Sequence, residues 1–251
     1  DLVYSMDQFA SVGFTGFEPS FASVQEVQNL EPLLQKHNIT TGSLYVKSVL
    51  HDETQTAASI MQVLEIARAA KPLGVKILVT NPSPIRWGGD EDKTDKQLII
   101  QAQALNELGE NLRNMGLTLA YHTHYAEMRN GAREFHHMLL GTDSENVKLC
   151  LDAHWVYRGS GDSQVALFDI VELYKDRIVE LHLRQSKDGI WTEIFTEGDV
   201  DYGRLAKMLK QSGINPHIVL EQAVEEGSPH TMGAVEAHSE GMEYAKEIFN
   251  G

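Results

Sequence analysis

Four apolar, strand-like runs in this sequence lead to a side chain that can bind a metal ion. Glu127 follows the run that begins at Leu117, and Asp152 closes the run VKLCLD. His182 lies in IVELHL, and Glu221 closes IVLE. A mixed set of carboxylate oxygens and an imidazole nitrogen suits Mn²⁺, Mg²⁺, Co²⁺ or Fe²⁺, whereas structural zinc sites more often use thiolates. The pattern therefore indicates that these strand ends converge on one divalent cation.

Each of the four side chains also has an ordinary structural interpretation. Glu127 is compatible with a solvated loop charge, and Asp152 with the N-cap of a helix. His182 is compatible with a hydrogen-bonded strand histidine, and Glu221 with one half of an ion pair. Taken singly, these interpretations are the better ones. Four such strand ends in succession favour the metal site.

The elements that would position these residues alternate regularly along the chain. Apolar residues at helical spacing end four times at a glycine, and an apolar strand-like run follows each time, at Gly13, Gly74, Gly116 and Gly213. A glycine after a helix suits the left-handed C′ position, and the alternation of helices and strands indicates a parallel sheet. Seven strands are expected, near residues 14–19, 41–46, 75–80, 117–122, 147–152, 178–183 and 217–221.

The alternation predicts an α/β fold, a (β/α)₈ TIM barrel formed as a single domain over residues 1–251. Because the pattern starts on a helix at residues 3–12, we expect the first barrel strand to lie upstream of Asp1. A doubly wound open sheet is the alternative, but no Gly-rich phosphate-binding motif follows any expected strand. In a barrel of this kind the functional groups lie at the C-terminal ends of the strands.

Composition limits the classes of partner. The 251 residues carry 21 Lys and Arg against 36 Asp and Glu, a formal net charge of −15. Proteins that bind nucleic acid neutralise phosphates with basic side chains, so we expect no nucleic acid as partner. No apolar run approaches the roughly 20 residues that span a bilayer, so we expect no membrane partner either. The single cysteine, Cys150, is expected to pack as a small apolar residue. A cytoplasmic location is favoured, a periplasmic one requires an upstream signal peptide that has been removed, and a homo-oligomer is compatible with the sequence.

Six segments resemble those of a known enzyme family. They are YHTHYAE (121–127), LDAHWVYRGSGD (151–162), ELHLRQ (180–185), TEGDVDY (196–202), VLEQ (219–222) and LNELGENLRNMGL (105–117). Together they are similar to the sugar phosphate isomerase/epimerase family of xylose isomerase-like TIM barrels. The resemblance implies that Glu127, Asp152, His182 and Glu221 bind one divalent metal ion. Mn²⁺ is the expected ion, with Mg²⁺, Co²⁺, Fe²⁺ or Zn²⁺ as alternatives.

The resemblance also implies a reaction. Glu127 and Glu221 would face opposite sides of a substrate carbon and exchange its proton, through an enediolate stabilised by the cation. The substrate would be a keto-sugar or related polyol, and an unphosphorylated one is favoured because the recognised strand-end motifs contain only Arg158 and Arg184 as basic residues. Departures from the family pattern, notably Arg184 for the usual Lys and Gln185 for the usual Asp, leave the substrate less defined than the metal.

Five residues near these motifs are candidates for binding the substrate, namely His124, His154, Trp155, Arg184 and Glu197. His154 stands where the family often has Tyr, Trp155 offers a flat face to a sugar ring, and Glu197 is expected to contact substrate or Arg184. Of the two histidines in HTH, we expect His124 to face the pocket and His122 to pack outside the barrel.

Other functions share parts of this pattern. A lyase or dehydratase acting on a 3-keto sugar or glycoside would begin with the same proton abstraction. A DNA-repair endonuclease of the same superfamily would need more histidine ligands and a basic face. A sugar-binding module with a vestigial site would be expected to have lost one of the glutamates, and both are present. The metal-dependent isomerase or epimerase is therefore the leading hypothesis.

Overall fold

The computed structural model describes residues 2–250, and these fall into two compact units. The central unit is Thr15–Cys150. The terminal unit comprises Asp1–Phe14 and Leu151–Gly251. Strand β5 (Val147–Asp152) runs across the boundary between them, so that its last two residues belong to the terminal unit.

The central unit is a parallel sheet with helices between its strands. Its strands β1 (Ser20–Phe21), β2 (Ser43–Val46), β3 (Ile77–Thr80), β4 (Thr118–Tyr121) and β5 pair with one another in chain order, all parallel. The connecting helices are α2 (Val24–His37), α3 (Thr56–Ala70), α4 (Asp95–Asn114) and α5 (Arg129–Leu140). Short 3₁₀ turns, η1 (Lys71–Leu73) and η2 (Ala126–Met128), precede β3 and α5.

Local sequence sets where these helices begin and end. Helix α4 starts with a capping box, because the Thr94 hydroxyl accepts from the Gln97 N–H and the Gln97 side chain accepts from the Thr94 N–H. It ends before Gly116, whose φ of +75° is a conformation that glycine adopts readily. The Leu117 N–H then donates to the Leu112 carbonyl at 2.9 Å, which turns the chain into β4.

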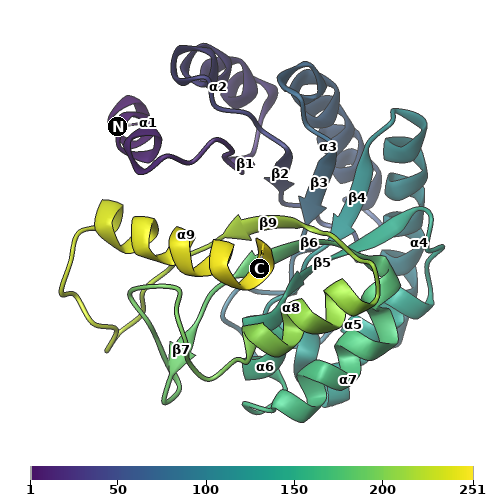
Figure 1. The fold of residues 1–251 in the computed structure, drawn as a ribbon. Helices are drawn as coiled ribbons and strands as arrows, with labels where there is room; N and C mark the ends of the chain where they lie inside the picture. Colours follow the sequence, from purple (N-terminus) through teal and green to yellow (C-terminus); the bar gives the residue numbers. More distant parts are fainter. Residues whose placement is uncertain (1, 251) are drawn as a thin grey trace. The chain divides into compact units, whose positions relative to one another are not determined.

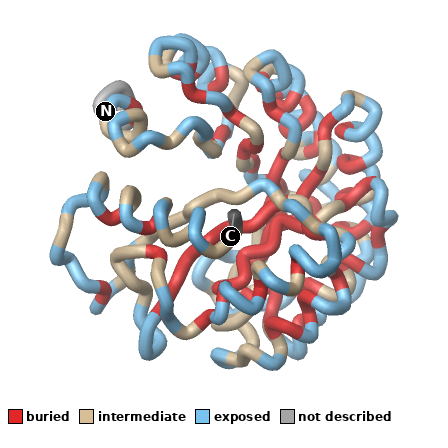
Figure 2. Tube along the Cα trace, viewed as in Figure 1, coloured by how far each residue is buried: buried red, intermediate tan, exposed pale blue. Residues whose placement is uncertain are grey.

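The core lies along the strands and the helix faces that cover them (Figure 2). Leu105, Leu108 and Leu112 follow one face of α4 and are fully buried where this helix packs on β4. Leu78 of β3 and Leu119 of β4 are buried as well. Burial of this apolar stripe provides the main stabilisation of the layer, at about 1.5–3 kcal/mol for each fully buried leucine.

The terminal unit contains a parallel pair of strands and a small hairpin (Figure 1). Strand β6 (Ile178–Leu183) pairs with β9 (His217–Leu220), and the antiparallel hairpin is β7 (Ser186–Lys187) with β8 (Ile190–Trp191). Its helices are α1 (Leu2–Val12), α6 (Ala153–Gly159), α7 (Gln164–Tyr174), α8 (Tyr202–Gln211) and α9 (Ala234–Asn250), with a 3₁₀ turn η3 (Lys175–Arg177). Helix α9 packs against α1, α8 and β9.

Six of the seven expected strands are present near their expected positions, and β5 and β6 have the expected bounds. The prediction of a strand at residues 14–19 is wrong, because no strand forms within this range. Only one bridge, Gly16 with Thr40, forms there, and β1 begins at Ser20. Pro19 has no N–H to donate to a ladder, although its carbonyl accepts from Tyr45 N at 2.8 Å. No helix within residues 2–250 is long and apolar enough to cross a bilayer.

The close approach of α4 to the segment before β5 gives a testable prediction. A Cβ added at Gly109 would lie 2.1 Å from the Asn146 carbonyl oxygen, so Gly109→Ala forces the backbones apart. We expect a loss of about 1–3 kcal/mol in the free energy of unfolding, measured by urea denaturation. Gly203→Ala in α8, where the nearest atom is 3.5 Å away, is the control and should be neutral or stabilising. Equal effects of the two changes would contradict the close approach.

Candidate metal centre

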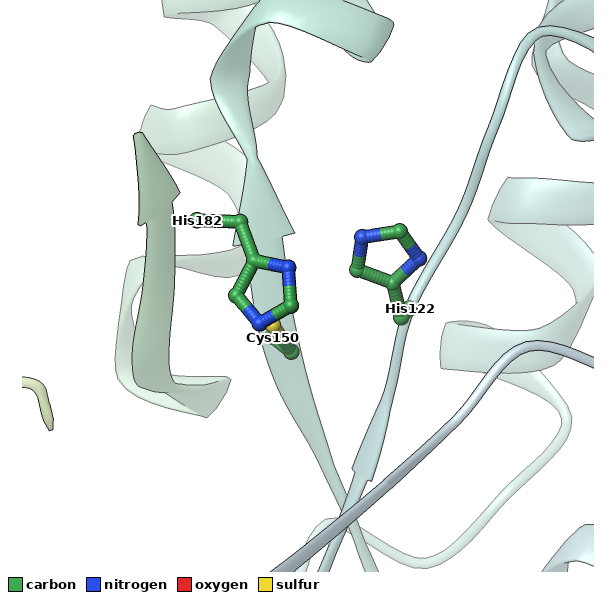
Figure 3. Close-up of side chains that lie close together, drawn as sticks. All are labelled: His122, Cys150 and His182. Carbon is green, nitrogen blue, oxygen red and sulfur yellow. The ribbon is translucent and has the colours of Figure 1, made fainter. Parts of the chain in front are cut away.

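Three of the four expected metal ligands lie together in the terminal unit. Asp152 ends β5, His182 lies on β6 (Figure 3), and Glu221 directly follows β9. Each offers one ligand atom, and these atoms lie within 4.8 Å of one another. Asp152 and His182 are buried, whereas Glu221 is half-buried. The cluster therefore combines a buried carboxylate and a buried imidazole with a second carboxylate that solvent still reaches.

The parallel pairing of β6 with β9 brings two of these residues to the same edge. Leu183 lies opposite Leu220, so the two strands end at the same level. The Glu221 N–H extends the ladder by donating to the Leu183 carbonyl at 3.0 Å. Asp152 has a second function at its own strand end, since its Oδ1 accepts from the Trp155 N–H at 2.9 Å and caps α6. The N-cap interpretation of Asp152 is thus correct and compatible with metal binding.

Hydrogen bonds and an ion pair hold His182 and Glu221 in place. Nδ1 of His182 lies 2.8 Å from Oε2 of Glu221, and Nε2 lies 3.2 Å from Oε1 of Glu180. The second Glu221 oxygen, Oε1, accepts from Nη2 of Arg184. Both carboxylate oxygens of Glu221 are therefore oriented by the protein, one toward His182 and one toward Arg184.

The charge balance of the cluster favours a cation. Burial, together with the negative charge of Glu221, raises the pKa of Asp152 to about 6 against the opposing effect of Arg184. A divalent cation would favour the ionised form of Asp152 by placing positive charge between the carboxylates. The donor set, with two carboxylates and an imidazole, fits a hard or borderline divalent ion such as Mg²⁺ or Mn²⁺.

Aromatic rings surround the candidate substrate-binding residues of this unit. His154 is buried, and its ring lies 6.3 Å from Trp155 and 6.1 Å from Trp191 between centroids. Neither of its ring nitrogens has a hydrogen-bond partner among residues 2–250. Burial, assisted by Arg158 and Arg184, lowers the pKa of His154 to about 3, so the imidazole is neutral at physiological pH. The Arg184 guanidinium lies over both tryptophans.

Trp191 was not among the residues expected from the sequence. A signal for its hairpin was available, because Asp188-Gly189 is a dipeptide that favours a two-residue turn. Both residues adopt positive φ, +54° and +80°. What the sequence did not indicate is that this turn would bring Trp191 over Arg184, which is seven residues earlier in the chain.

Glu197 is placed differently from the expectation. Its side chain is exposed, and its charge acts on Tyr244, whose pKa is raised mainly by burial and secondarily by Glu197. The ion pair of Arg184 is with Glu221. The expected contact of Glu197 with Arg184 is therefore wrong, because the segment after β8 directs Glu197 to solvent.

The fourth expected ligand, Glu127, belongs to the central unit. It lies in η2 just after β4 and is 1% exposed, so it is not a solvated loop charge. Its Oε2 accepts from the His124 N–H at 2.7 Å. His124 in turn lies 3.1 Å through Nδ1 from Oδ1 of Asn81, and its ring contacts Trp87 edge to face at 5.5 Å. Asn81, which follows β3, was not anticipated, although a polar residue at a strand end is the signal that would have indicated it.

His122 does not pack outside the sheet as expected. Tyr121 takes that face and packs on Phe135 of α5, with ring centroids 6.3 Å apart. His122 is 1% exposed and contacts Tyr45 at 5.8 Å and His124 at 4.8 Å between rings. Cys150 of β5, also drawn in Figure 3, is buried, and its Sγ lies within 4.8 Å of a ring nitrogen of His122. Residues two apart in extended chain share a face, so both histidines lie on the side opposite Tyr121.

Comparison with known proteins decides the family. The model of the xylose isomerase-like TIM barrel family matches residues 6–248. The chain belongs to this family. It is 22% identical to an inosose dehydratase of Clostridium botulinum (strain Alaska E43 / Type E3), over 97% of this chain and 88% of that protein.

Solved structures agree on the fold. A sugar phosphate isomerase/epimerase from Parabacteroides distasonis superposes with a TM-score of 0.75 at 17% identity, covering 97% of this chain and 87% of that one. A xylose isomerase-like TIM barrel protein from Mycobacterium smegmatis in complex with magnesium superposes with a TM-score of 0.74 at 13% identity, covering 99% of this chain and 88% of that one. The TIM-barrel prediction and the family resemblance are thereby confirmed.

The raised pKa of Asp152 predicts a measurable gain in stability from removing its charge. Because the pKa is higher in the folded chain than in the unfolded one, the favourable contribution of protonated Asp152 is complete below about pH 4 and is lost as pH rises through 6. Asp152→Asn, which can still cap α6, should stabilise the metal-free protein at pH 8 by about 1–3 kcal/mol.

Thermal unfolding at pH 8 and pH 4 measures this effect, with Asp169→Asn on the exposed side of α7 as the control. The gain should shrink toward zero at pH 4. A variant that is less stable than the wild type at pH 8 would show that the contacts of the ionised carboxylate outweigh its burial.

Proposed function

We propose that this protein is a divalent-metal-dependent isomerase or epimerase of a keto-sugar or related polyol. The observation that carries the proposal is the group formed by Asp152, His182 and Glu221, whose ligand atoms lie within 4.8 Å of one another. Glu127 completes the proposed ligand set. Its support is its burial directly after β4 and the general rule that the C-terminal strand ends of a (β/α)₈ barrel surround one mouth.

The proposed chemistry is proton exchange at a carbon next to a carbonyl. A bound divalent cation supplies Lewis acidity that polarises the carbonyl and the neighbouring hydroxyl of the substrate. One glutamate removes the C–H proton, giving an enediolate, and the other or the same one returns it. Return to the opposite face of the same carbon gives an epimer, and return to the neighbouring carbon gives an isomer.

The surroundings of Glu127 and Glu221 are compatible with the removal and return of a substrate proton. The His124 N–H holds Oε2 of Glu127, and burial keeps bulk water from competing for the proton. His182 and Arg184 hold the two oxygens of Glu221. Carboxylates oriented in advance spend little free energy on reorganisation when a substrate binds.

The ion pairs of the recognised motifs support an unphosphorylated substrate. Arg184 is paired with Glu221, and Arg158 donates to both carboxylate oxygens of Glu225 at 2.9 and 2.8 Å. A phosphate group would have to compete with these carboxylates for either guanidinium. The neutral imidazole of His154 and the ring of Trp155 offer contacts for hydroxyls and the apolar face of a sugar.

A dehydratase is the second candidate, and the similarity to inosose dehydratase over 97% of the chain favours it. Its first step is the same proton abstraction. The enediolate then expels the hydroxyl group of the carbon next to the carbanion centre as the C–O bond breaks, and this oxygen takes up the proton removed in the first step, so that one molecule of water leaves. Chromatography and mass spectrometry of the products of keto-sugars and of inosose separate the two reactions, because only the dehydratase product has lost water.

Replacement of either glutamate tests the shared first step. Glu127→Gln and Glu221→Gln should each lower the rate of solvent deuterium incorporation into the substrate at least ~100-fold, since an amide cannot accept the proton. Exchange is followed by NMR in deuterated water, and both variants should keep the circular dichroism of the wild type. Glu172→Gln on the exposed side of α7 is the matched control and should exchange normally. Near-normal exchange in either test variant would exclude that glutamate as a base.

A further inference from the structure

We infer that Trp191, on the hairpin β7–β8, is a positioning residue that holds Arg184 against Glu221 and thereby sets the affinity of the metal centre. The inference rests on the proposed function, because it assumes that Glu221 is a metal ligand. It assigns a role to a hairpin outside the proposed ligand set.

Arg184 is held by Glu221 on one side and by two tryptophan rings. Its side chain is 4% exposed, Nη2 donates to Oε1 of Glu221, and Nε lies 3.4 Å from the Glu221 carbonyl oxygen. The guanidinium carbon lies 4.3 Å from the ring centroid of Trp191 and 5.4 Å from that of Trp155. A guanidinium removed from water gains more from an aromatic face than an exposed one, so the closer ring, Trp191, fixes its position most strongly.

The hairpin β7–β8 is anchored by side chains from other segments of the terminal unit. A hairpin with strands of two residues does not hold its shape alone. The Trp191 N–H donates to Oε1 of Glu225 at 2.9 Å, and Glu225 also binds Arg158. Nη2 of Arg158 donates to the Gly189 carbonyl at 2.7 Å. Glu225 and Arg158 therefore fasten the β8 side of the hairpin.

Asp199 fastens the β7 side and the turn. Its carboxylate accepts from the Ser186 hydroxyl at 2.7 Å and from the N–H groups of Asp188 and Gly189 at 3.0 and 2.9 Å. Because carboxylates hold the hairpin from two sides, the Trp191 ring is fixed relative to Arg184.

The environment of the Trp191 ring separates a positioning role from stacking on a sugar. The Arg158 guanidinium also lies over this ring, at 5.2 Å. The ring further contacts Trp155 at 5.5 Å and His154 at 6.1 Å. With two guanidinium groups over it and two aromatic neighbours, the ring is used for packing.

The position of Arg184 affects the orientation of the Glu221 carboxylate. While Arg184 holds Oε1, Oε2 is directed to His182, which is a member of the ligand cluster. Without the Trp191 ring, Arg184 has more freedom and Glu221 is less well oriented before the metal binds. Changes to residues that orient metal ligands typically cost 10–100-fold in metal affinity.

The test is calorimetric titration of the metal-free protein with Mn²⁺, which needs no substrate. Trp191→Leu should weaken Mn²⁺ binding about tenfold. Trp191→Phe keeps an aromatic face and should restore the affinity to within about threefold of wild type. Arg184→Lys keeps the charge but not the planar fork and should resemble Trp191→Leu. Lys187→Ala, at an exposed position of the same hairpin, is the control and should bind Mn²⁺ as the wild type does.

Three results would overturn the inference in different ways. Unchanged Mn²⁺ affinity in Trp191→Leu with a raised KM for substrate would make Trp191 a substrate contact. Equal weakening in Trp191→Phe and Trp191→Leu would remove the role of the aromatic face. A wild-type protein that binds no Mn²⁺ would remove the proposed metal centre itself, and this outcome is separate because it precedes any comparison of variants.

Discussion

The constraint on which the terminal unit depends is the burial of several carboxylates close to one another. Asp152 and Glu180 are fully buried, and Glu221 lies beside His182 with Asp152 close by. Charges in such a place are costly unless they are paired, so the parallel strands that bring these residues together also supply the compensating groups. Arg184 follows β6 and reaches Glu221 beyond β9, and His182 lies between two carboxylates. The hairpin β7–β8 and the segment with Glu225 are then needed to hold Arg184 in place.

Much of the fold could be predicted because it is encoded locally. The apolar runs of β5 and β6 are long, β5 ends at Asp152 and β6 carries His182 one residue before its end, and both strands have the bounds expected from sequence. The candidate ligands Asp152, His182 and Glu221 follow from these strand ends. What the sequence did not reveal depends on distant partners. Trp191 takes its position from Glu225, 34 residues away, and Arg158 meets the same carboxylate across 67 residues.

For Glu127, too, the sequence predicted the position in the chain but not the environment of the side chain. The sequence placed it after an apolar strand, but only the structure shows that it is buried and bound to the His124 N–H. The family model establishes the barrel, whereas the reaction is a proposal that rests on the side chains at the strand ends. In the terminal unit the ring of His154 lies beside Trp155, and in the central unit the ring of His124 contacts Trp87.

The central claim, that the carboxylates and imidazole at the strand ends form one metal site, is tested most directly by elemental analysis of the purified protein alongside Glu221→Gln. The account predicts about one divalent ion per chain in the wild type and less in the variant, because an amide oxygen is a weaker ligand than a carboxylate. The protein should be analysed as purified and again after incubation with Mn²⁺ or Co²⁺ and removal of free metal. Absence of bound metal from the wild type in both samples would contradict the account.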